Sequence, residues 1–299
     1  MKNSKEAYIA FPQNTIRLLQ QYDFQFRKQF GQNFLVDLHV LDKILRAADI
    51  GPEDICIEIG PGIGSLTQAL AEQAGRVIAV EIDTRLIPIL EENLAAYDNI
   101  AIVQADFMEL ALPDFLREQG VDRPVKVVAN LPYYITTPLI MRLFESGIPL
   151  DSVTVMVQEE VARRMQAGPG TKDYGALSMA VQYYAEPSIK AFVPPNCFIP
   201  RPGVGSAVIL LKRRPEPRVA VQDPAQMFAM IRAGFGQRRK TLVNSLSGSP
   251  ELSLTKEEAQ NLLLEAGLSP LVRGEALTLE QFAELSDLWT QKEKTETER

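Results

Sequence analysis

The most informative stretch of the sequence is CIEIGPGIGSLTQAL, residues 56–70. An apolar run interrupted by Glu58 leads into three glycines, Gly60, Gly62 and Gly64, and a helix-like segment follows. Glycine lets the backbone turn tightly and come close to a ligand. Because ligands of open α/β sheets bind at the carboxyl ends of the strands, this stretch predicts a strand, a ligand-binding loop and a helix.

Strand-like and helix-like segments alternate through the first two thirds of the chain. We expect strands at residues 54–60, 76–83, 99–106, 125–131, 152–158, around 188–193 and 206–212. The first five are rich in Val and Ile and nearly continuous in apolar character, which is typical of a parallel sheet covered on both faces. Helices are expected at residues 65–74, 85–95, 138–146 and 159–167. The alternation predicts an α/β, Rossmann-like domain with a seven-stranded, mostly parallel sheet.

The composition changes after Lys212. The segment RRPEPRVAVQDP contains three prolines and is typical of a linker, and only helical patterns follow it. Asp223 before Pro224 predicts a helix start, and Thr255 with Glu258 and Thr278 with Gln281 have capping-box spacing. We therefore expect an N-terminal extension at residues 1–25, the α/β domain at 26–213, and a helical domain at 214–299 with a frayed tail.

Composition excludes several classes of function. No apolar run reaches the roughly 18 residues of a membrane span, and the N-terminus lacks a secretory signal. The two cysteines, Cys56 and Cys197, and the single histidine, His39, provide neither a disulfide framework, nor a zinc site, nor a Ser-His-Asp triad. We expect His39 to be a structural residue of a helix, no metal, and a cytoplasmic, reduced protein without a membrane partner.

Charge is spread unevenly along the chain. The net charge is -7, yet residues 190–240 contain ten Lys and Arg against two acidic residues. Residues 251–299 contain eleven acidic residues against five basic ones. A basic stretch in an acidic chain fits local RNA contact, and the candidate residues are Arg238, Arg239 and Lys240. The alternative is an ordinary solvated helix face.

The spacing of the glycines bears on the cofactor. A nicotinamide enzyme is expected to have G-x-G-x-x-G, whereas this chain has G-x-G-x-G with Ser65 at the completing position. Glu58 is awkward beside a pyrophosphate and tolerable beside a cationic sulfonium. A glycine loop alone is weak evidence for a particular cofactor, but together these features favour S-adenosylmethionine.

Acidic residues follow at the ends of the next two predicted strands. Glu81 lies 21 residues beyond Gly60, the spacing at which a carboxylate accepts hydrogen bonds from ribose hydroxyls. Asp106 ends the third strand and could accept a hydrogen bond from the adenine amine of the cofactor. A turn or helix-cap role is the alternative for Asp106.

The fourth strand ends in Asn130-Leu131-Pro132-Tyr133. The exocyclic amine of adenine is a poor nucleophile because its lone pair is delocalised into the ring. The Asn130 side-chain oxygen and the Leu131 carbonyl could accept its two hydrogens and free the lone pair. Pro132 would fix the turn, and Tyr133 could stack on an extruded base. The alternative is a strand-ending turn without a chemical role.

Together these motifs resemble the rRNA adenine dimethyltransferases. EIGPGIG, VEID, QAD and NLPY occur in that family's order, with KQFGQNFL at residues 28–35, NCFIPRPGVGSAV at 196–208 and QRRKTLVNSL at 237–246. Within the family the small-subunit branch is the most similar. The resemblance implies a class I methyltransferase fold and dimethylation of two adjacent adenosines near the 3′ end of 16S rRNA, within an immature small ribosomal subunit during its biogenesis.

The resemblance also implies roles for single residues. The residues implied to contact S-adenosylmethionine, whose product is S-adenosylhomocysteine, are Asn33, Leu35, Gly60, Glu81, Asp106 and Asn130. Asn130 to Tyr133 are implied to hold the target adenine, and Phe198 to stack on its other face. Gly203 and Gly205 stand where the family often has a lysine and an aspartate, which weakens the expectation of RNA contacts there. The family implies a monomer.

Three other interpretations compete with this one. An erythromycin-resistance type methylase of large-subunit rRNA shares the glycine loop and the NLPY turn, although the long helical C-terminal region favours the small-subunit branch. A dinucleotide-dependent oxidoreductase requires a different glycine spacing. A ribosome-assembly or transcription factor that has lost activity would not need the intact NLPY and Asp106.

Overall fold

The computed structural model describes residues 8–27, 31–237 and 239–297, with side chains to residue 294. The chain divides into two compact units, each described here by itself. The larger unit contains residues 1–162 and 186–213, and the second unit contains residues 163–185 and 214–299. Residues 163–185, which the sequence placed in the α/β domain, therefore group with the helical unit.

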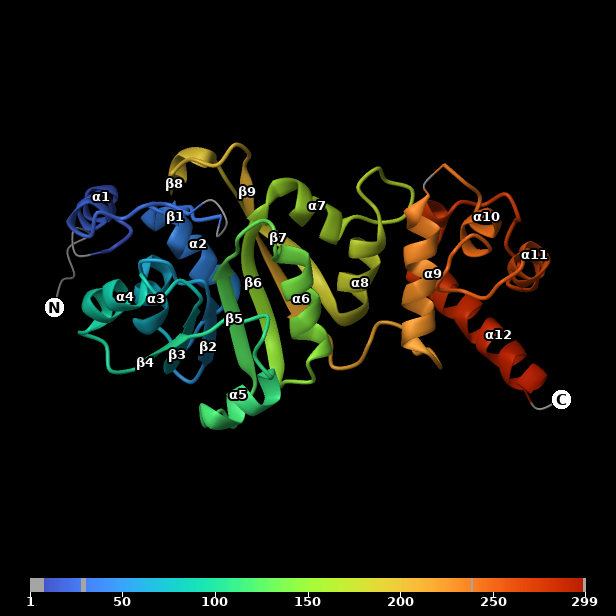
Figure 1. Ribbon diagram of the computed structural model, residues 1–299, viewed down its shortest axis with the longest axis horizontal. Coiled ribbons are helices and arrows are strands. Elements are labelled where there is room, and N and C mark those ends of the chain that lie inside the picture. Colours follow the sequence, from blue (N-terminus) through green and yellow to red (C-terminus); the bar gives the residue numbers. More distant parts are fainter. Residues whose placement is uncertain (1–7, 28–30, 238, 298–299) are drawn as a thin grey trace. The chain divides into compact units, whose positions relative to one another are not determined.

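A seven-stranded sheet forms the centre of the larger unit, in the order β4-β3-β2-β5-β6-β9-β7 (Figure 1). Its strands are β2 (Ile55–Ile59), β3 (Arg76–Glu81), β4 (Ile100–Gln104), β5 (Val125–Asn130), β6 (Leu150–Gln158), β7 (Ala185–Val193) and β9 (Ser206–Arg213). The pairs among β4, β3, β2, β5 and β6 are parallel, whereas β6 and β9 are antiparallel. The predicted fold class is confirmed, and all seven predicted strands are present; β7 begins three residues before its predicted start.

The larger unit also contains helices. They are α1 (Pro12–Gln21), α2 (Leu38–Ala48), α3 (Ser65–Ala71), α4 (Ile87–Leu94), α5 (Leu112–Glu118), α6 (Thr136–Glu145) and the start of α7 (Glu159–Gln166). Apolar residues of α2 and α3 share a core with Cys56, Val77, Val128 and Met156 of four neighbouring strands. Asp37 caps α2 by accepting hydrogen bonds from two backbone N–H groups, so the helix expected around His39 is confirmed.

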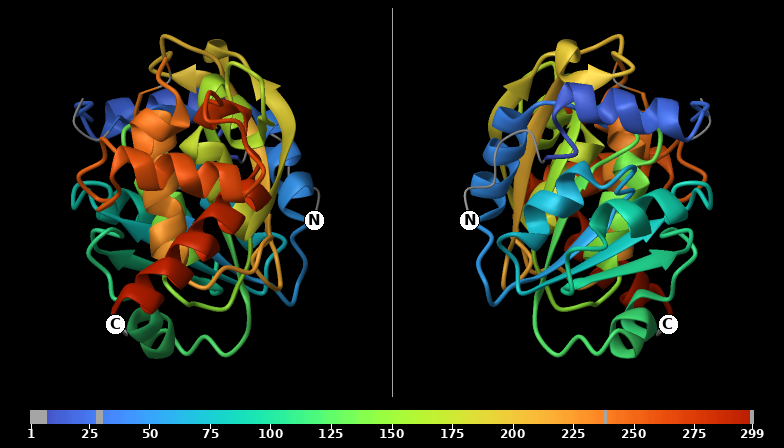
Figure 2. Two further views of the ribbon diagram at one scale, coloured as in Figure 1. Left: turned by 90° about the vertical axis from the view of Figure 1, so that its right-hand side faces the viewer. Right: turned by 90° about the vertical axis from the view of Figure 1, so that its left-hand side faces the viewer.

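A second, two-stranded sheet lies outside the large one. β1 (Phe34–Leu35) pairs antiparallel with β8 (Phe198–Ile199), which follows the 3₁₀ turn η3 (Pro195–Cys197). In Figure 1 and in the right-hand view of Figure 2, α1 (dark blue) and the β8 segment (yellow) lie at the same end of the larger unit. Segments from both ends of the larger unit's sequence therefore meet at one end of its sheet.

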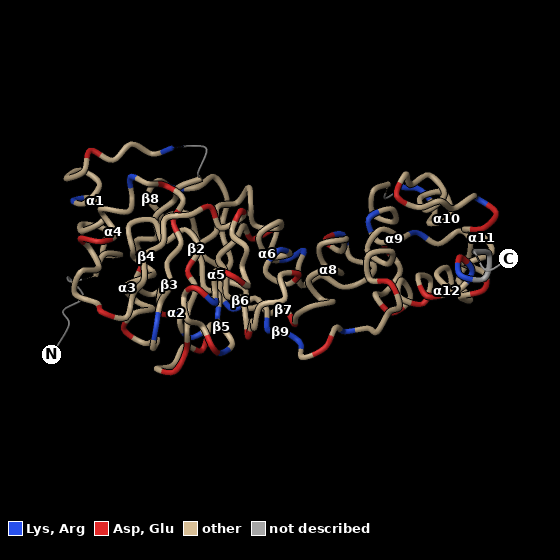
Figure 3. Tube along the Cα trace, turned by 60° about the horizontal axis from the view of Figure 1, so that its bottom comes forward, with Lys and Arg blue, Asp and Glu red and all other residues tan. Residues whose placement is uncertain are grey.

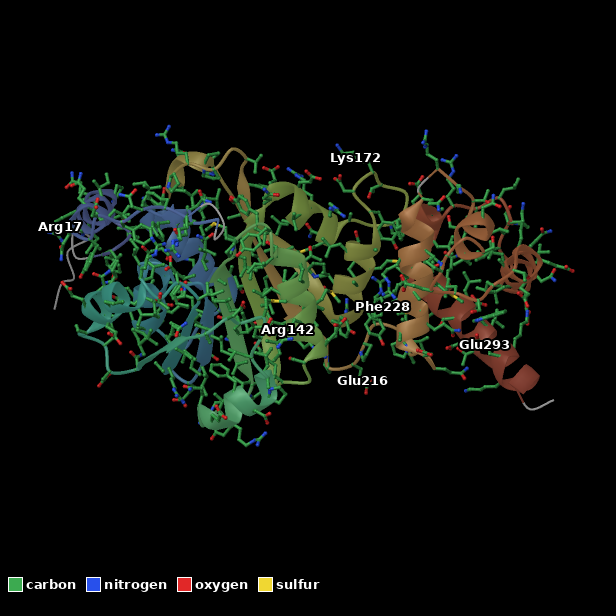
Figure 4. The ribbon with its side chains drawn as sticks, in the orientation of Figure 1. Arg17, Arg142, Lys172, Glu216, Phe228 and Glu293 are labelled. Carbon is green, nitrogen blue, oxygen red and sulfur yellow. The ribbon has the colours of Figure 1, made fainter. Side chains whose placement is uncertain are left out.

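The second unit is helical. It contains the end of α7, then α8 (Ala176–Tyr184), α9 (Pro224–Gly236), α10 (Leu242–Leu246), α11 (Lys256–Glu265), the 3₁₀ turn η4 (Gly274–Ala276) and α12 (Leu279–Thr297). Phe228, labelled in Figure 4, extends from α9 and lies edge-on to Tyr183 of α8, with ring centroids 5.2 Å apart. These helices enclose a core of their own.

The predicted helix caps of this unit are confirmed. Asp223 accepts a hydrogen bond from the Gln226 N–H at the start of α9. Thr255 and Glu258 form a reciprocal capping box at α11, and the Thr278 and Gln281 side chains each accept a hydrogen bond from the other's N–H at α12. Acidic positions recur along α12 in Figure 3, as the composition of this region predicted. No helix in the described part of the chain is long and apolar enough to cross a membrane.

Candidate active site

Three polar side chains reach the same face of the large sheet because residues two apart along a strand point the same way. Cys56, Val77 and Val128 of β2, β3 and β5 belong to the core beneath α2 and α3. Glu58, Glu81 and Asn130 follow them by two, four and two residues, so they share that face at the carboxyl ends of the three strands. All three line one pocket, together with the glycine loop.

The glycine loop leaves room for a ligand. Gly60 has a φ of 68°, a conformation that residues with a Cβ rarely adopt, and a Cβ added there would meet no atom within 4 Å. Gly62 has a φ of 63°, and a Cβ there would lie 2.9 Å from the Phe34 ring. The loop therefore has open space at Gly60 and close packing at Gly62.

Glu81 is buried and holds the loop. Its two carboxylate oxygens accept hydrogen bonds from the N–H of Gly62 at 3.1 Å and of Asp83 at 2.8 Å. Burial raises its pKa, although these N–H donors partly offset the effect. The carboxylate thus sits at the position from which the sequence predicted contact with a ribose.

Glu58 has no such partners on one of its oxygens. Its Oε2 atom is fully buried and accepts no hydrogen bond from the described residues. Burial raises the pKa of Glu58 to about 8; the nearby Thr67 hydroxyl partly offsets this rise, and the nearby charge of Glu81 adds to it. Because an unpartnered buried carboxyl is costly, a pocket lined by Glu58 suits a ligand that brings a positive charge or a hydrogen-bond donor.

The Asn130-to-Tyr133 turn is held from two sides. Asn130 Nδ2 donates to the backbone oxygen of Asn33 at 3.0 Å, which joins β5 to a segment 97 residues away. The Tyr133 hydroxyl and the Ser206 Oγ of β9 lie 2.9 Å apart in a hydrogen bond. An amide whose nitrogen is engaged presents its oxygen elsewhere, so the Asn130 oxygen remains the acceptor at the pocket.

The structure brings most of the predicted site residues to this pocket. The predicted residues that line it are Asn33, Leu35, Gly60, Glu81, Asn130, Leu131, Pro132 and Tyr133. They come from four separate stretches of sequence, and the fold brings all four to the same pocket.

Asp106 is not among the described residues that line the pocket. It is exposed, and its Oδ1 accepts a hydrogen bond from the Met108 N–H at 2.8 Å, which is the turn role weighed as the alternative. Arg142 of α6, labelled in Figure 4, donates to the Leu110 carbonyl and so holds this loop. Burial and the charges of Asp106 and Glu81 raise the pKa of Tyr134.

Phe198 is not placed where the sequence put it. Its side chain is 2% exposed and belongs to the core shared with Leu35 and Met156, not to the pocket lining. Phe198 pairs with Leu35 in the two-residue sheet, and its ring packs into the core that Leu35 also joins. In this conformation its ring cannot stack on a base.

The predicted RNA-contact residues lie in the second unit. Arg239 and Lys240 are exposed in the turn between α9 and α10. Arg238 falls outside the described residues.

Several residues at or near the pocket were not predicted, and three of them have a clear structural task. Gln32 lines the pocket, Asp83 supports Glu81, and Ser206 holds Tyr133. Gln32 stands in the motif GQNF, Asp83 in VEID, and Ser206 at the end of GVGS. The motifs could therefore have indicated these positions, whereas the residue types alone could not.

Comparison with known proteins identifies the family of the chain. A family model described as "Ribosomal RNA adenine dimethylase" matches residues 23–291. A relative from Lachnoclostridium phytofermentans, named "Ribosomal RNA small subunit methyltransferase A", is 56% identical over 289 residues, which cover 96% of this chain and 100% of the relative.

Two solved structures are also similar. A dimethyladenosine transferase from Plasmodium falciparum aligns with a TM-score of 0.72 and 25% identity, covering 87% of this chain and 98% of that one. The 23S rRNA methyltransferase ErmE aligns with a TM-score of 0.64 and 28% identity, covering 85% and 98%.

A doubly wound sheet with a glycine loop and acidic side chains at the ends of adjacent strands defines a Rossmann-like, nucleoside-binding α/β protein. The chain belongs to the ribosomal RNA adenine dimethylase family. It is an rRNA adenine methyltransferase, and the resemblance seen in its motifs is confirmed.

Proposed function

We propose that the protein transfers methyl groups from S-adenosylmethionine to the exocyclic amines of two adjacent adenosines near the 3′ end of 16S rRNA, giving dimethyladenosine. The observation that carries the proposal is the pocket in which Glu58, Glu81 and Asn130 meet the glycine loop. The name of the Lachnoclostridium relative supports the small subunit as the substrate.

The pocket residues fit S-adenosylmethionine. Glu81 is placed to accept hydrogen bonds from ribose hydroxyls, and Gly60 leaves open space beside it. The unpartnered Glu58 carboxyl suits the positive charge of the cofactor. Asn33 and Leu35 close the pocket from the N-terminal segment. Asp106, whose Oδ1 accepts the Met108 N–H, would use its other carboxylate oxygen for the adenine amine. When bound, S-adenosylmethionine supplies a methyl group activated by its sulfonium.

The target adenine would be held by the Asn130-to-Tyr133 turn. The Asn130 oxygen and the Leu131 carbonyl would accept the two hydrogens of the amine, so its lone pair becomes available for in-line attack. Tyr133, fixed by Ser206, would stack on the extruded base, a contact worth roughly 1–3 kcal/mol. Since the Phe198 ring is buried, the proposal assigns stacking to Tyr133 and gives Phe198 the task of holding Leu35.

The helical unit would contact RNA through the surface that carries Arg239 and Lys240, with Arg238 between α9 and this pair in sequence. The larger unit would then carry the chemistry. We propose that a monomer acts in the cytoplasm on an immature small ribosomal subunit, without a membrane partner.

The test is transfer of labelled methyl groups from S-adenosylmethionine to purified small and large subunits that lack the relevant methylation. We expect dimethyladenosine in the small subunit alone, with the rate lowered about 100-fold or more in Asn130→Ala. Label on the large subunit alone would assign the protein to the branch of ErmE, whose structure it also resembles. Label on neither subunit would reject the proposed substrate.

A further inference from the structure

A buried carboxylate beside the pocket connects the predicted ribose-binding residue to the N-terminal segment. Asp83 follows β3 by two residues and is 2% exposed. It is not among the described residues that line the pocket. Its N–H donates to Glu81 Oε1 at 2.8 Å, so the position of Asp83 bears directly on Glu81.

The carboxylate of Asp83 is engaged on both oxygens. Gln32 Nε2 donates to Oδ2 at 2.9 Å, and Arg85 Nε donates to Oδ1 at 2.9 Å. Although burial alone would raise it, these hydrogen bonds lower the pKa of Asp83. The group is therefore an ionised acceptor that orients two side chains from different parts of the chain.

Both side chains continue into the N-terminal segment. Arg85 Nη1 donates to the Gln25 carbonyl at 3.0 Å, and its guanidinium lies 5.1 Å from the centre of the Phe24 ring. Gln32 Oε1 accepts a hydrogen bond from the Arg27 N–H at 3.0 Å. The Asp83 carboxylate thus holds the chain on both sides of residues 28–30.

Residues 31–35, here called the strap, form one wall of the pocket. Asn33 accepts the hydrogen bond from Asn130, the Phe34 ring packs against Gly62, and Leu35 pairs with Phe198. Gln32 is the strap residue that reaches Asp83. A continuous set of contacts therefore runs from Glu81 through Asp83 and Gln32 to the Asn130 turn.

We infer that Asp83 is a positioning residue that, through Gln32 and Arg85, fixes the strap over the pocket and thereby sets the affinity for the methyl donor. The inference rests on the proposed function for the identity of the ligand. It assigns Asp83 to ligand capture and not to the chemical step, because its contacts lead to the pocket wall and to Glu81.

The test uses Arg85→Met, which removes one side of the Asp83 contact without touching the pocket lining, and Gln32→Ala, which removes the other. Binding of S-adenosylhomocysteine, measured by calorimetry, is expected to weaken about tenfold in each, the loss typical of one hydrogen bond to a charged group. At saturating donor the turnover number of Arg85→Met, whose altered residue does not line the pocket, should stay within about twofold, so the change appears in KM. Arg85→Lys should restore part of the affinity.

A matched control removes another partly buried ion pair of the same unit. Lys126 Nζ lies 2.8 Å from Asp54 Oδ2, and neither residue lines the pocket. Asp54→Asn should leave S-adenosylhomocysteine affinity unchanged. If Asp54→Asn lost as much affinity, the loss in the Arg85 and Gln32 variants would reflect a general loss of stability. That result would overturn the inference.

Hydrogen exchange without ligand separates this inference from the proposed function. Amides of residues 31–35 should exchange faster in Gln32→Ala and Arg85→Met, while those of β2 and β5 stay as in the wild type. Unchanged strap exchange together with unchanged affinity would overturn the role of Asp83. Wild-type protein that binds S-adenosylhomocysteine but methylates no rRNA would refute the proposed function and leave the Asp83 result standing.

Discussion

At the scale of single residues, the two glutamates of the pocket show that the environment of a carboxyl group, and not its residue type, sets its pKa and its need for a partner. Glu81 accepts two backbone N–H donors, whereas Glu58 Oε2 has no partner among the described residues. Both carboxyls are buried. Glu58 therefore depends more than Glu81 on a ligand, or on a proton, to compensate the loss of hydration.

This difference predicts how the free energy of unfolding changes with pH. Below pH 4.5 the Glu58 carboxyl is protonated in both states and contributes no pH dependence. Between its ordinary pKa of 4.5 and its folded value of about 8, the unfolded state loses the proton while the folded state keeps it. The unfolded state then binds fewer protons, so stability falls as the pH rises through this window.

Glu58→Gln should remove that contribution. We expect the ligand-free variant to gain stability relative to the wild type between pH 5 and pH 8, by about 1–3 kcal/mol, as measured by urea unfolding at both pH values. The same variant should bind S-adenosylmethionine more weakly because it cannot supply a negative charge. If the free energy of unfolding changed with pH equally in the wild type and the variant, Glu58 would not be the group that causes the pH dependence.

Residue-scale prediction from sequence succeeded where the backbone pattern fixed direction. The positions of Glu58, Glu81 and Asn130 at the carboxyl ends of predicted parallel strands were enough to place them at one edge of the sheet. It did not anticipate the burial of Phe198, because the pairing of the two-residue strands β1 and β8 leaves no periodicity in the sequence. Asp106 shows a different limit, since a turn residue and a ligand contact have the same sequence signal.

At the scale of elements, the helical unit contains a close backbone approach that its sequence did not reveal. A Cβ added to Gly274, in η4, would lie 2.7 Å from the Gly234 carbonyl oxygen in α9. The obstructing atom belongs to the backbone and cannot move aside as a flexible side chain would. Gly274 is therefore required by the packing of η4 on α9.

Gly274→Ala should lower the free energy of unfolding by about 1–3 kcal/mol, the usual penalty for overpacking a tight core contact. Gly236→Ala is the matched control, because a Cβ at Gly236, also in α9, meets no atom within 4 Å. That change should be neutral or slightly stabilising, since alanine favours a helix more than glycine does. Thermal unfolding of the two variants measures this difference. Equal melting temperatures would contradict the close approach of Gly274 to α9.

Long, regular elements were predicted well and short or non-local ones were not. All seven strands of the sheet and the helix caps at Asp223, Thr255 and Thr278 follow from periodicity and cap chemistry. The helices α1, α5 and α8 were missed, as were β1 and β8. The Gln32–Asp83 contact joins residues 51 positions apart, and such a pairing leaves no local pattern in a single sequence.

At the scale of the whole molecule, the net charge of -7 opposes a nucleic-acid substrate, yet the family acts on rRNA. Local clusters resolve this conflict because salt screens charges that lie beyond about 10 Å at 0.1 M ionic strength. Exposed Arg239 and Lys240 would then act on nearby phosphates with little opposition from distant acidic residues. The sequence could indicate the cluster, but not whether phosphates meet it.

The dependence of RNA binding on salt tests this directly. Each phosphate contact by Lys or Arg contributes about 0.7–0.9 to the slope of log affinity against log salt concentration. The combined change of Arg238, Arg239 and Lys240 to Ala should weaken binding to the small subunit at low salt and reduce the slope by about two. Affinity for S-adenosylhomocysteine should be unchanged.

The control removes the same formal charge elsewhere in the helical unit. Lys256, Arg273 and Lys292 lie in the acidic C-terminal region, and Lys292 is already paired with Glu265. Their combined change to Ala should leave the slope near the wild-type value, because screened or paired charges release few counterions on binding. If both triple variants lowered the slope equally, total charge would govern binding, and the surface around Arg239 would lose its assigned role.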